Sequence, residues 1–214
     1  MIRGPAVDLG TEAVNAHVSF FMPLNRWILW GGGPRLGPAV LIWSYLVVIV
    51  LIAYALGRIP WSPISSRQWL LLALGLTQVH PLVAVIVVGW LLALRLRASQ
   101  PMPSDRISFN LIQVGLGIWT LGALACLYSA IAQGLLAVPD MQIAGNGSTN
   151  IQLNWTLDRI AGSMPQPWVI SLPLSVYRGL MLLWALWLAQ ALLRWLRHGW
   201  LCFCEGGIWK KRGL

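Results

Sequence analysis

Long apolar runs separated by short polar connections dominate the pattern along this chain. The last run covers residues 176–196, and only Arg178, Gln190 and Arg194 interrupt it. At about 1.5 Å per residue it makes a helix of roughly 31 Å, which matches the hydrocarbon thickness of a bilayer. A basic, aromatic tail follows. We therefore interpret residues 174–214 as a membrane span with an amphipathic tail behind it.

Two earlier runs also predict membrane helices. Residues 39–56 carry no charged side chain, and residues 107–138 are long enough to project beyond a bilayer. Within the second run, small residues recur at steps of seven, three, four and three. This spacing places them on one helix face, where another helix can approach closely. The small residues are Gly115, Gly122, Ala125, Ser129 and Ala132.

Residues 69–94 allow two interpretations. As one straight helix they would measure about 39 Å, which exceeds the bilayer core. Pro81 lies near their middle, where it removes a backbone donor and biases His80 away from helical angles. One interpretation is a single tilted span kinked at Pro81. The other is an interfacial helix over 67–76 followed by a short span over 81–97. We favour the kinked span, which gives three spans within residues 39–138.

The two remaining segments are more polar. Residues 1–38 have a polar opening, an aromatic group and then the sequence GGGPRLGP, whose glycines and prolines disfavour a regular helix. We interpret them as a cytoplasmic or interfacial segment, and residues 139–173 as an ordered extracytoplasmic loop. The pattern thus predicts an all-α, multi-pass helical membrane protein with about four transmembrane helices.

Composition and charge agree with a membrane location. Hydrophobic residues make up 57% of the chain and charged residues 10%, against about 25% charged in ordinary soluble domains. The net charge of +9 comes from basic residues that flank the apolar runs and form no single patch. This distribution argues against nucleic-acid binding and predicts contact with anionic lipid headgroups.

The positions of the basic residues predict an orientation. With four spans, eleven of the 15 basic residues fall on the N-terminal segment, the connection between the second and third spans, and the C-terminal tail. The positive-inside rule then places both termini in the cytoplasm and the 139–173 loop outside.

Two residues in the 69–94 run are candidates for a transport pathway. Gln78 and His80 are polar groups at membrane depth, where such side chains are costly and often line a pathway. No Asp or Glu lies inside any predicted span, which weakens a proton relay. The alternative is that His80 marks a helix break satisfied by neighbouring backbone.

Arg178 and Asp158 are candidates for lipid binding or loop pairing. Arg178 lies about one turn inside the last span, where it could bind a lipid phosphate or pair with Asp158 or Asp140 of the loop. The alternative is an arginine that snorkels to the interface. The loop has Ser and Thr but no His, so no catalytic residue is assigned. No cofactor or metal site is predicted either.

Several stretches resemble a group of known proteins. They are PQPWVISLPLSVYRGLMLLWALWLAQALLRWLRHGW with the following CFCEGGIW, and also GGGPRLGPAVLIW and WLLLALGLTQVHP. Together they resemble the C-terminal membrane portion of uncharacterised bacterial inner-membrane proteins. The resemblance implies an inner-membrane location and no particular activity. It also implies that this region follows a larger soluble part, with the present chain a short or truncated version.

These observations favour a structural or assembly module in the bacterial inner membrane. Such a module would anchor a membrane-protein partner, or form a homo-oligomer, through the small-residue face of residues 107–138. The alternative is a transport or channel component with a pathway near Gln78 and His80. The absence of intramembrane carboxylates favours the first hypothesis, and a membrane enzyme has the least support.

Overall fold

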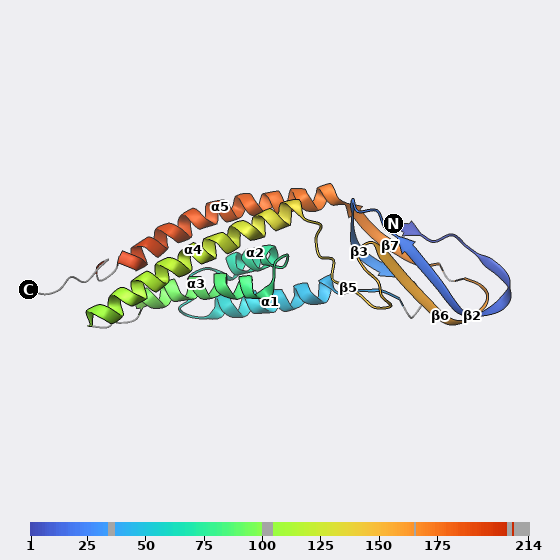
Figure 1. Cartoon of the computed structure of the whole chain (residues 1–214), viewed down its shortest axis with the longest axis horizontal. Helices are drawn as coiled ribbons and strands as arrows, with labels where there is room; N and C mark the ends of the chain where they lie inside the picture. Colours follow the sequence, from blue (N-terminus) through green and yellow to red (C-terminus); the bar gives the residue numbers. More distant parts are fainter. Residues whose placement is uncertain (34–36, 100–104, 165, 205–206, 208–214) are drawn as a thin grey trace, which may run out of the picture. The chain divides into compact units, whose positions relative to one another are not determined.

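The computed structural model describes residues 1–33, 37–99, 105–164, 166–204 and 207. The chain forms two compact units and enters each of them twice. The first, the β unit, comprises Met1–Val47 and Val138–Leu180. The second, the helical unit, comprises Val48–Ala137 and Met181–Leu214. Two of the three boundaries fall within helices, namely α1 (Ile42–Arg58) and α5 (Leu174–Cys204), and the third directly follows α4 (Arg106–Leu136) (Figure 1).

Antiparallel strands build the β unit. One sheet has the strand order β1-β7-β3, and β2 pairs with β6 and β4 with β5. In the described part of the chain the strands are β1 (Ile2–Arg3), β2 (Asp8–Phe21), β3 (Arg26–Gly32), β4 (Ala39–Val40), β5 (Ile143–Ala144), β6 (Gln152–Ser163) and β7 (Trp168–Pro173). Each of these pairings joins the N-terminal segment to the segment after residue 137.

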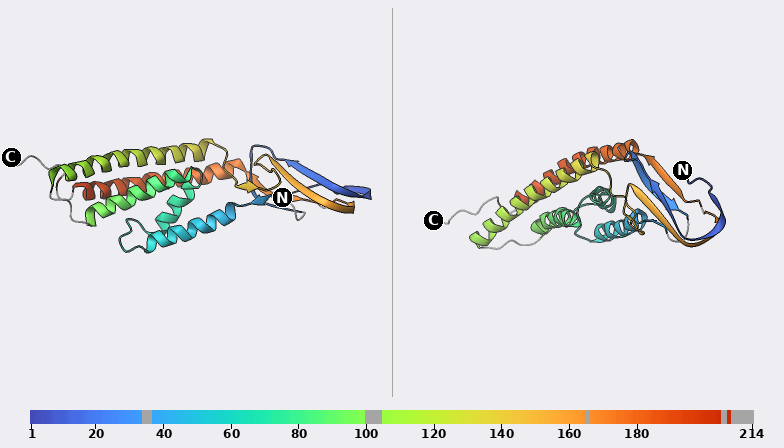
Figure 2. Two further views of the ribbon diagram at one scale, coloured as in Figure 1. Left: turned by 60° about the horizontal axis from the view of Figure 1, so that its bottom comes forward. Right: turned by 45° about the vertical axis from the view of Figure 1, so that its right-hand side comes forward.

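The longest pairing joins β2 to β6, which run side by side in both views of Figure 2. The register runs from Asp8 opposite Ser163 to Phe21 opposite Gln152, with one irregularity after Asp8. Side chains alternate between the faces of a strand, so apolar residues at every second position share one face. Val18 therefore shares a face with its partner Trp155, and Phe20 with Leu153.

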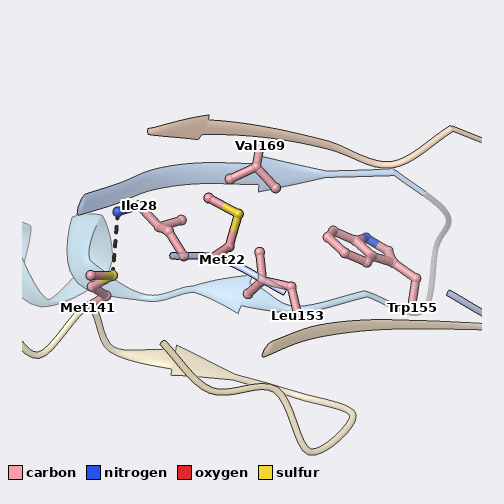
Figure 3. Packing of buried hydrophobic residues seen from close by; sticks show 6 residues of the cluster. All are labelled: Met22, Ile28, Met141, Leu153, Trp155 and Val169. Atoms are coloured by element: carbon pink, nitrogen blue, oxygen red, sulfur yellow. Dashed lines mark hydrogen bonds between the residues drawn. The ribbon is translucent and has the colours of Figure 1, made fainter. Parts of the chain in front are cut away.

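This apolar face belongs to the core of the β unit (Figure 3). The buried cluster consists of Met22, Ile28, Met141, Leu153, Trp155 and Val169. Phe20 packs edge-on against Trp155 with 5.3 Å between ring centroids, and the Ile28 amide donates to Met141 Sδ at 3.4 Å. Both chain segments contribute to the core, so neither can bury its apolar side chains without the other.

The prediction of an all-α protein was therefore wrong. Residues 1–38 and 139–173 are not a terminal segment and a separate loop, because they pair strand by strand into antiparallel sheets. The pairing also rules out placing these two segments on opposite sides of a membrane. Backbone hydrogen bonds at strand spacing require both segments to be in the same compartment.

The helical unit contains α2 (Ser66–Leu76), α3 (Pro81–Ser99), α4 (Arg106–Leu136) and the larger parts of α1 and α5. Among the described residues, three helices are long and apolar enough to cross a membrane, namely α3, α4 and α5. α1 is apolar but has only 17 residues. The prediction of about four spans was therefore wrong.

The favoured kinked span over residues 69–94 was also wrong. α2 and α3 are separate helices, and residues 77–80 form the break between them. Ser65 caps the start of α2, where its amide donates to Gln68 Oε1 at 3.1 Å. α3 begins at Pro81, a residue whose missing donor is tolerated in a first helical turn. The proline therefore starts a helix and does not kink one.

The long helices of the helical unit lie side by side (Figure 2) and pack through heptad-spaced faces. The buried face of α4 contains Phe109, Gln113, Leu116, Ala123, Leu127 and Ala130. α5 buries Met181, Trp184, Leu188, Ala191 and Trp195 at steps of three and four. Indole hydrogen bonds connect the helices. Trp90 Nε1 of α3 donates to Thr120 Oγ1 of α4 at 2.9 Å, and Trp184 Nε1 of α5 donates to Leu71 O of α2 at 2.7 Å. This spacing is typical of left-handed helix packing.

Candidate functional site

The outer surface of the helical unit is apolar. Leu121 and Leu193 expose 70% and 72% of their surfaces, whereas Gln113 and Asn110 are buried. Gln113 Nε2 donates to the carbonyl of Phe203 at 3.0 Å, so this buried amide connects α4 to α5. A surface of exposed leucines around an interior that holds hydrogen-bonded amides differs from the usual surface of a soluble protein. The arrangement suits a hydrocarbon environment, in which helix association relies on packing and interhelical hydrogen bonds.

One exposed face of α4 has a regular pattern of its own. Its residues are separated by alternating steps of four and three, from Leu111 to Leu136. We call this face the outer seam; it consists of Leu111, Gly115, Ile118, Gly122, Ala125, Ser129, Ala132 and Leu136. All of its members are exposed except Ser129 and Ala132, which are half-buried. At 3.6 residues per turn, the outer seam lies about 150° around the helix from the buried face.

The glycines of the outer seam face open space. A Cβ added to Gly115 or Gly122 would have no neighbouring atom within 4 Å. Gly75 on α2 differs, because a Cβ there would coincide with the indole of Trp184. Gly75 is thus required for packing inside the unit, whereas Gly115 and Gly122 are available to a helix from outside it.

The small residues predicted as a packing face all lie on the outer seam. Within the described residues this face is not the one that packs, since α4 uses Leu116, Ala123 and Leu127 instead. The sequence pattern identified a helix-compatible surface but did not distinguish packing within the chain from packing with another chain. The intervening Leu111, Ile118 and Leu136, which complete the heptad spacing, were missed.

The candidate pathway residues lie at a helix end and not in the middle of a span. Gln78 and His80 belong to the turn between α2 and α3. His80 is exposed, and its Nδ1 accepts a hydrogen bond from the Leu82 amide at 3.3 Å, the position of a helix N-cap. Gln78 Nε2 donates to Thr77 Oγ1 at 3.1 Å. The capping role corresponds to the helix-break alternative, and a transport pathway at these residues stays a prediction.

Arg178 and Asp158 are not brought together. Arg178 lies near the start of α5 and Asp158 on β6, and both side chains are exposed. Among the described residues, no hydrogen bond or ion pair joins them. Asp140, the other candidate partner, accepts from the amide and the side chain of Gln142 at 2.9 and 2.8 Å. Lipid binding by Arg178 stays a prediction.

Sequence reasoning missed a polar network on the face of β2–β6 opposite the core. Asn154 Oδ1 accepts from Ser19 Oγ at 2.9 Å and from Gln152 Nε2 at 3.1 Å. Its Nδ2 donates to the carbonyls of Asn146 and Gly147 at 3.2 and 3.3 Å. Asn154 therefore fixes the turn before β6. The alternation of apolar and polar residues over 152–157 was the available signal.

His17 completes this network at 3.0 Å from Ser19 Oγ. The Ser19 hydroxyl gives its single proton to Asn154, so His17 Nε2 must donate to Ser19 and cannot act as its base. The arrangement is therefore structural and does not activate a nucleophile. No group of three or more His, Cys, Asp or Glu side chains suited to a metal ion occurs in the described ranges.

Comparison of the chain with protein-family models, with curated proteins and with solved structures finds no significant match.

Proposed function

We propose that this chain is an assembly module of the bacterial inner membrane. In this proposal α3, α4 and α5 cross the bilayer, the β unit lies outside it, and a second copy of the chain docks on the outer seam. The observation that carries the proposal is the outer seam itself, an exposed heptad of small and branched apolar residues opposite the packed face of α4.

The strand pairing determines whether the number of crossings is odd or even. Since β2 pairs with β6, the chain before α1 and the chain after α4 must lie on one side. An even number of crossings must therefore separate them, and α3 and α4 supply two. The 11 residues of α2 reach only about 17 Å, too short to span a bilayer. In this topology α1 enters the bilayer from the β-unit side and α2 returns to that side without crossing. α5 then crosses the bilayer and takes the C-terminus to the opposite side.

The basic residues orient this revised topology. Eight of them lie at the end of α3, at the start of α4, at the end of α5 and in the C-terminal tail. The other seven are spread over the two segments of the β unit and over α1 and α2, so basic residues are denser at the ends of α3 and α5 and at the start of α4. The positive-inside rule then places the C-terminus in the cytoplasm and the β unit with the N-terminus outside.

Membrane topology also constrains how two copies meet. Both copies insert in the same orientation, so their α4 helices run parallel and identical residues of the outer seam face each other. Layers of Gly115 and Gly122 allow the backbones to approach closely, while Leu111, Ile118 and Leu136 supply contact area. A second copy fits this surface because, in a parallel pair of α4 helices, each residue of the outer seam meets the same residue of the other copy.

Disulfide cross-linking in membranes tests the self-association. Single cysteines at Ile118 and Tyr128 would be compared in a background lacking the native Cys126, Cys202 and Cys204. Both side chains are highly exposed, but Tyr128 lies about 90° away from the outer seam at 3.6 residues per turn. Ile118→Cys should form dimers on mild oxidation and Tyr128→Cys should not. Equal cross-linking at both positions, or none at Ile118, would refute the proposal.

Bulk added at a seam glycine provides the complementary test. Gly122→Leu should leave the helical unit intact, because a Cβ there meets no atom of the chain. It should lower dimer formation by about tenfold, since the two helix backbones can no longer approach closely at this position. A dimer population unchanged by Gly122→Leu would show that copies meet elsewhere.

A further inference from the structure

A second surface of the helical unit is a half-open groove between α3, α4 and α5, with a volume of about 180 Å³. α3 contributes Trp90 and Leu94 to its wall, and α5 contributes Leu196, Trp200 and Phe203. For scale, an apolar protein cavity of about 150 Å³ stays dry and binds benzene. The groove is therefore large enough for a segment of a hydrocarbon chain.

The side chains that line the groove are mainly apolar. Thr120 is the only lining side chain with a hydroxyl. Its Oγ1 donates to Leu116 O at 2.8 Å and accepts from Trp90 Nε1 at 2.9 Å, so its proton and the Trp90 indole N–H are both engaged. Trp200 and Phe203 stack on each other with 6.0 Å between ring centroids, and the Trp200 indole N–H is the remaining side-chain donor of the lining. Such a surface favours an apolar ligand.

A glycine keeps the groove open. Gly117 lines it, and a Cβ added there would meet nothing within 4 Å. A side chain at this position would therefore project into free space. Gly199 on the opposite wall has a different role, since a Cβ there would stand 3.1 Å from Leu94 Cδ1. The groove is thus an opening next to packed helices and not a gap left by poor packing.

The last turns of α5, which line the groove, also carry positive charge. Arg194 and Arg197 are exposed on the same turns as the lining residues Leu196, Gly199 and Trp200. The helices α3, α4 and α5 contain no Asp or Glu, and the carboxylate of Asp105, which caps α4, is bonded to Ser108. An anionic group at the mouth of the groove would therefore meet guanidinium groups.

We infer that the groove binds one acyl chain of an anionic phospholipid, whose phosphate lies against Arg194 and Arg197. The apolar wall takes the chain and the arginines take the headgroup. In the proposed topology this end of the bundle faces the cytoplasmic leaflet, where anionic lipids attract basic segments. The inference rests on the proposed membrane insertion of α3, α4 and α5 but does not require docking at the outer seam.

A photoreactive lipid tests the inference on the full chain. The protein would be reconstituted in phosphatidylcholine vesicles that contain a minor fraction of phosphatidylglycerol with a diazirine in its acyl chain. Cross-linked peptides would be mapped for the unchanged chain, for Gly117→Leu and for the control Gly179→Leu, an exposed glycine near the start of α5 whose added Cβ also meets no atom. Gly117→Leu places a side chain in the groove with no clash at its Cβ and should lower cross-linking to the 196–203 region about tenfold. Gly179→Leu should leave it unchanged.

A double variant tests the headgroup contact. Arg194→Gln with Arg197→Gln should remove the advantage of unlabelled phosphatidylglycerol over phosphatidylcholine as a competitor. Groove cross-linking that Gly117→Leu does not lower would overturn the inference. So would labelling of the exposed residues near Leu183 and Leu193 without labelling of the groove. No labelling at any of these positions would refute membrane insertion, and with it both proposals. A dimer that survives Gly122→Leu would count against the outer seam alone.

Discussion

The β unit and the helical unit differ in the side chains that they expose. In the β unit, Ile28, Leu153 and Val169 are inaccessible, and polar residues such as Asp158 face outward. The helical unit also has an apolar interior, with the buried amides Gln113 and Asn110 in it, but its long helices expose leucines such as Leu121 and Leu193. The first surface is the one that water favours, and the second fits a hydrocarbon environment. Apolar side chains thus form the core of both units, and in the helical unit they also cover the outside of the long helices.

Removal of a core aromatic side chain should have the largest effect on stability, and the effect should be confined to the β unit. Trp155 is 1% exposed and contacts Phe20. Trp155→Ala should cost about 3–5 kcal/mol of β-unit stability through lost burial and a cavity. Hydrogen exchange of β2 and β6 should accelerate while that of α4 stays constant. The control Phe21→Ala, on the partner strand β2 and 74% exposed, should cost less than about 0.5 kcal/mol.

Alanine substitutions at two glycines, made separately, should distinguish the inside of the helical unit from its outside. Gly75→Ala places a methyl group where the Trp184 indole lies, so it should destabilise the unit by about 1–3 kcal/mol. Gly115→Ala meets no atom and gains helix propensity, so its effect should be zero or slightly stabilising. Thermal unfolding in detergent compares the two variants. Equal destabilisation would show that the outer seam is packed within the chain.

The polar network offers a smaller test of the β unit. Asn154→Ala removes four hydrogen bonds and leaves the carbonyls of Asn146 and Gly147 without their side-chain donor. The expected cost is about 1–3 kcal/mol. His17→Ala removes only the outer link to Ser19 and should cost about 0.5 kcal/mol. Chemical denaturation monitored in the β unit would measure both. A larger loss for His17→Ala would indicate that the network is organised around the imidazole.

The smallest effect is expected at the start of α4. Asp105 Oδ2 accepts from the Ser108 amide and hydroxyl, both at 3.0 Å, and so caps the helix. Asp105→Ala should cost about 1 kcal/mol, whereas Asp105→Asn keeps an acceptor and should lose little. Hydrogen exchange of the first turn of α4 measures the difference. Equal fraying in both variants would show that the charge of Asp105, and not its capping bond, stabilises this end.

The sequence predicted the helical unit better than the β unit for a physical reason. Uninterrupted apolar runs identify long helices directly, and α3, α4 and α5 each overlap a predicted apolar run, although the favoured span over 69–94 was wrong. Strand pairing between residues 8–21 and 152–163 depends on contacts across more than a hundred residues. Only the local alternation of Val18 and Phe20, or of Leu153 and Trp155, indicates it in advance.

The outer seam was predicted in part. The steps between Gly115, Gly122 and Ala125 identify a face where helices can approach, but spacing alone does not say which helix occupies it. The buried face of α4 has the same heptad spacing with Leu116, Ala123 and Leu127. Which face packs within the chain is decided by the positions of α3 and α5, which a single-sequence pattern does not contain. The structure also specifies the roles of His80, which caps α3, and of Pro81, which is the first residue of α3.

Labelling of single cysteines in intact cells tests whether α3 crosses the membrane with the β unit outside. Thr11, Ser163 and Ser99 would each be replaced by Cys in a background without native cysteines, and treated with a membrane-impermeant maleimide. Thr11 and Ser163 belong to the paired strands β2 and β6, and Ser99 ends α3. We expect labelling of Thr11→Cys and Ser163→Cys from outside, and of Ser99→Cys only after permeabilisation. Labelling of all three from the same side would show that α3 does not cross and would refute the proposed topology.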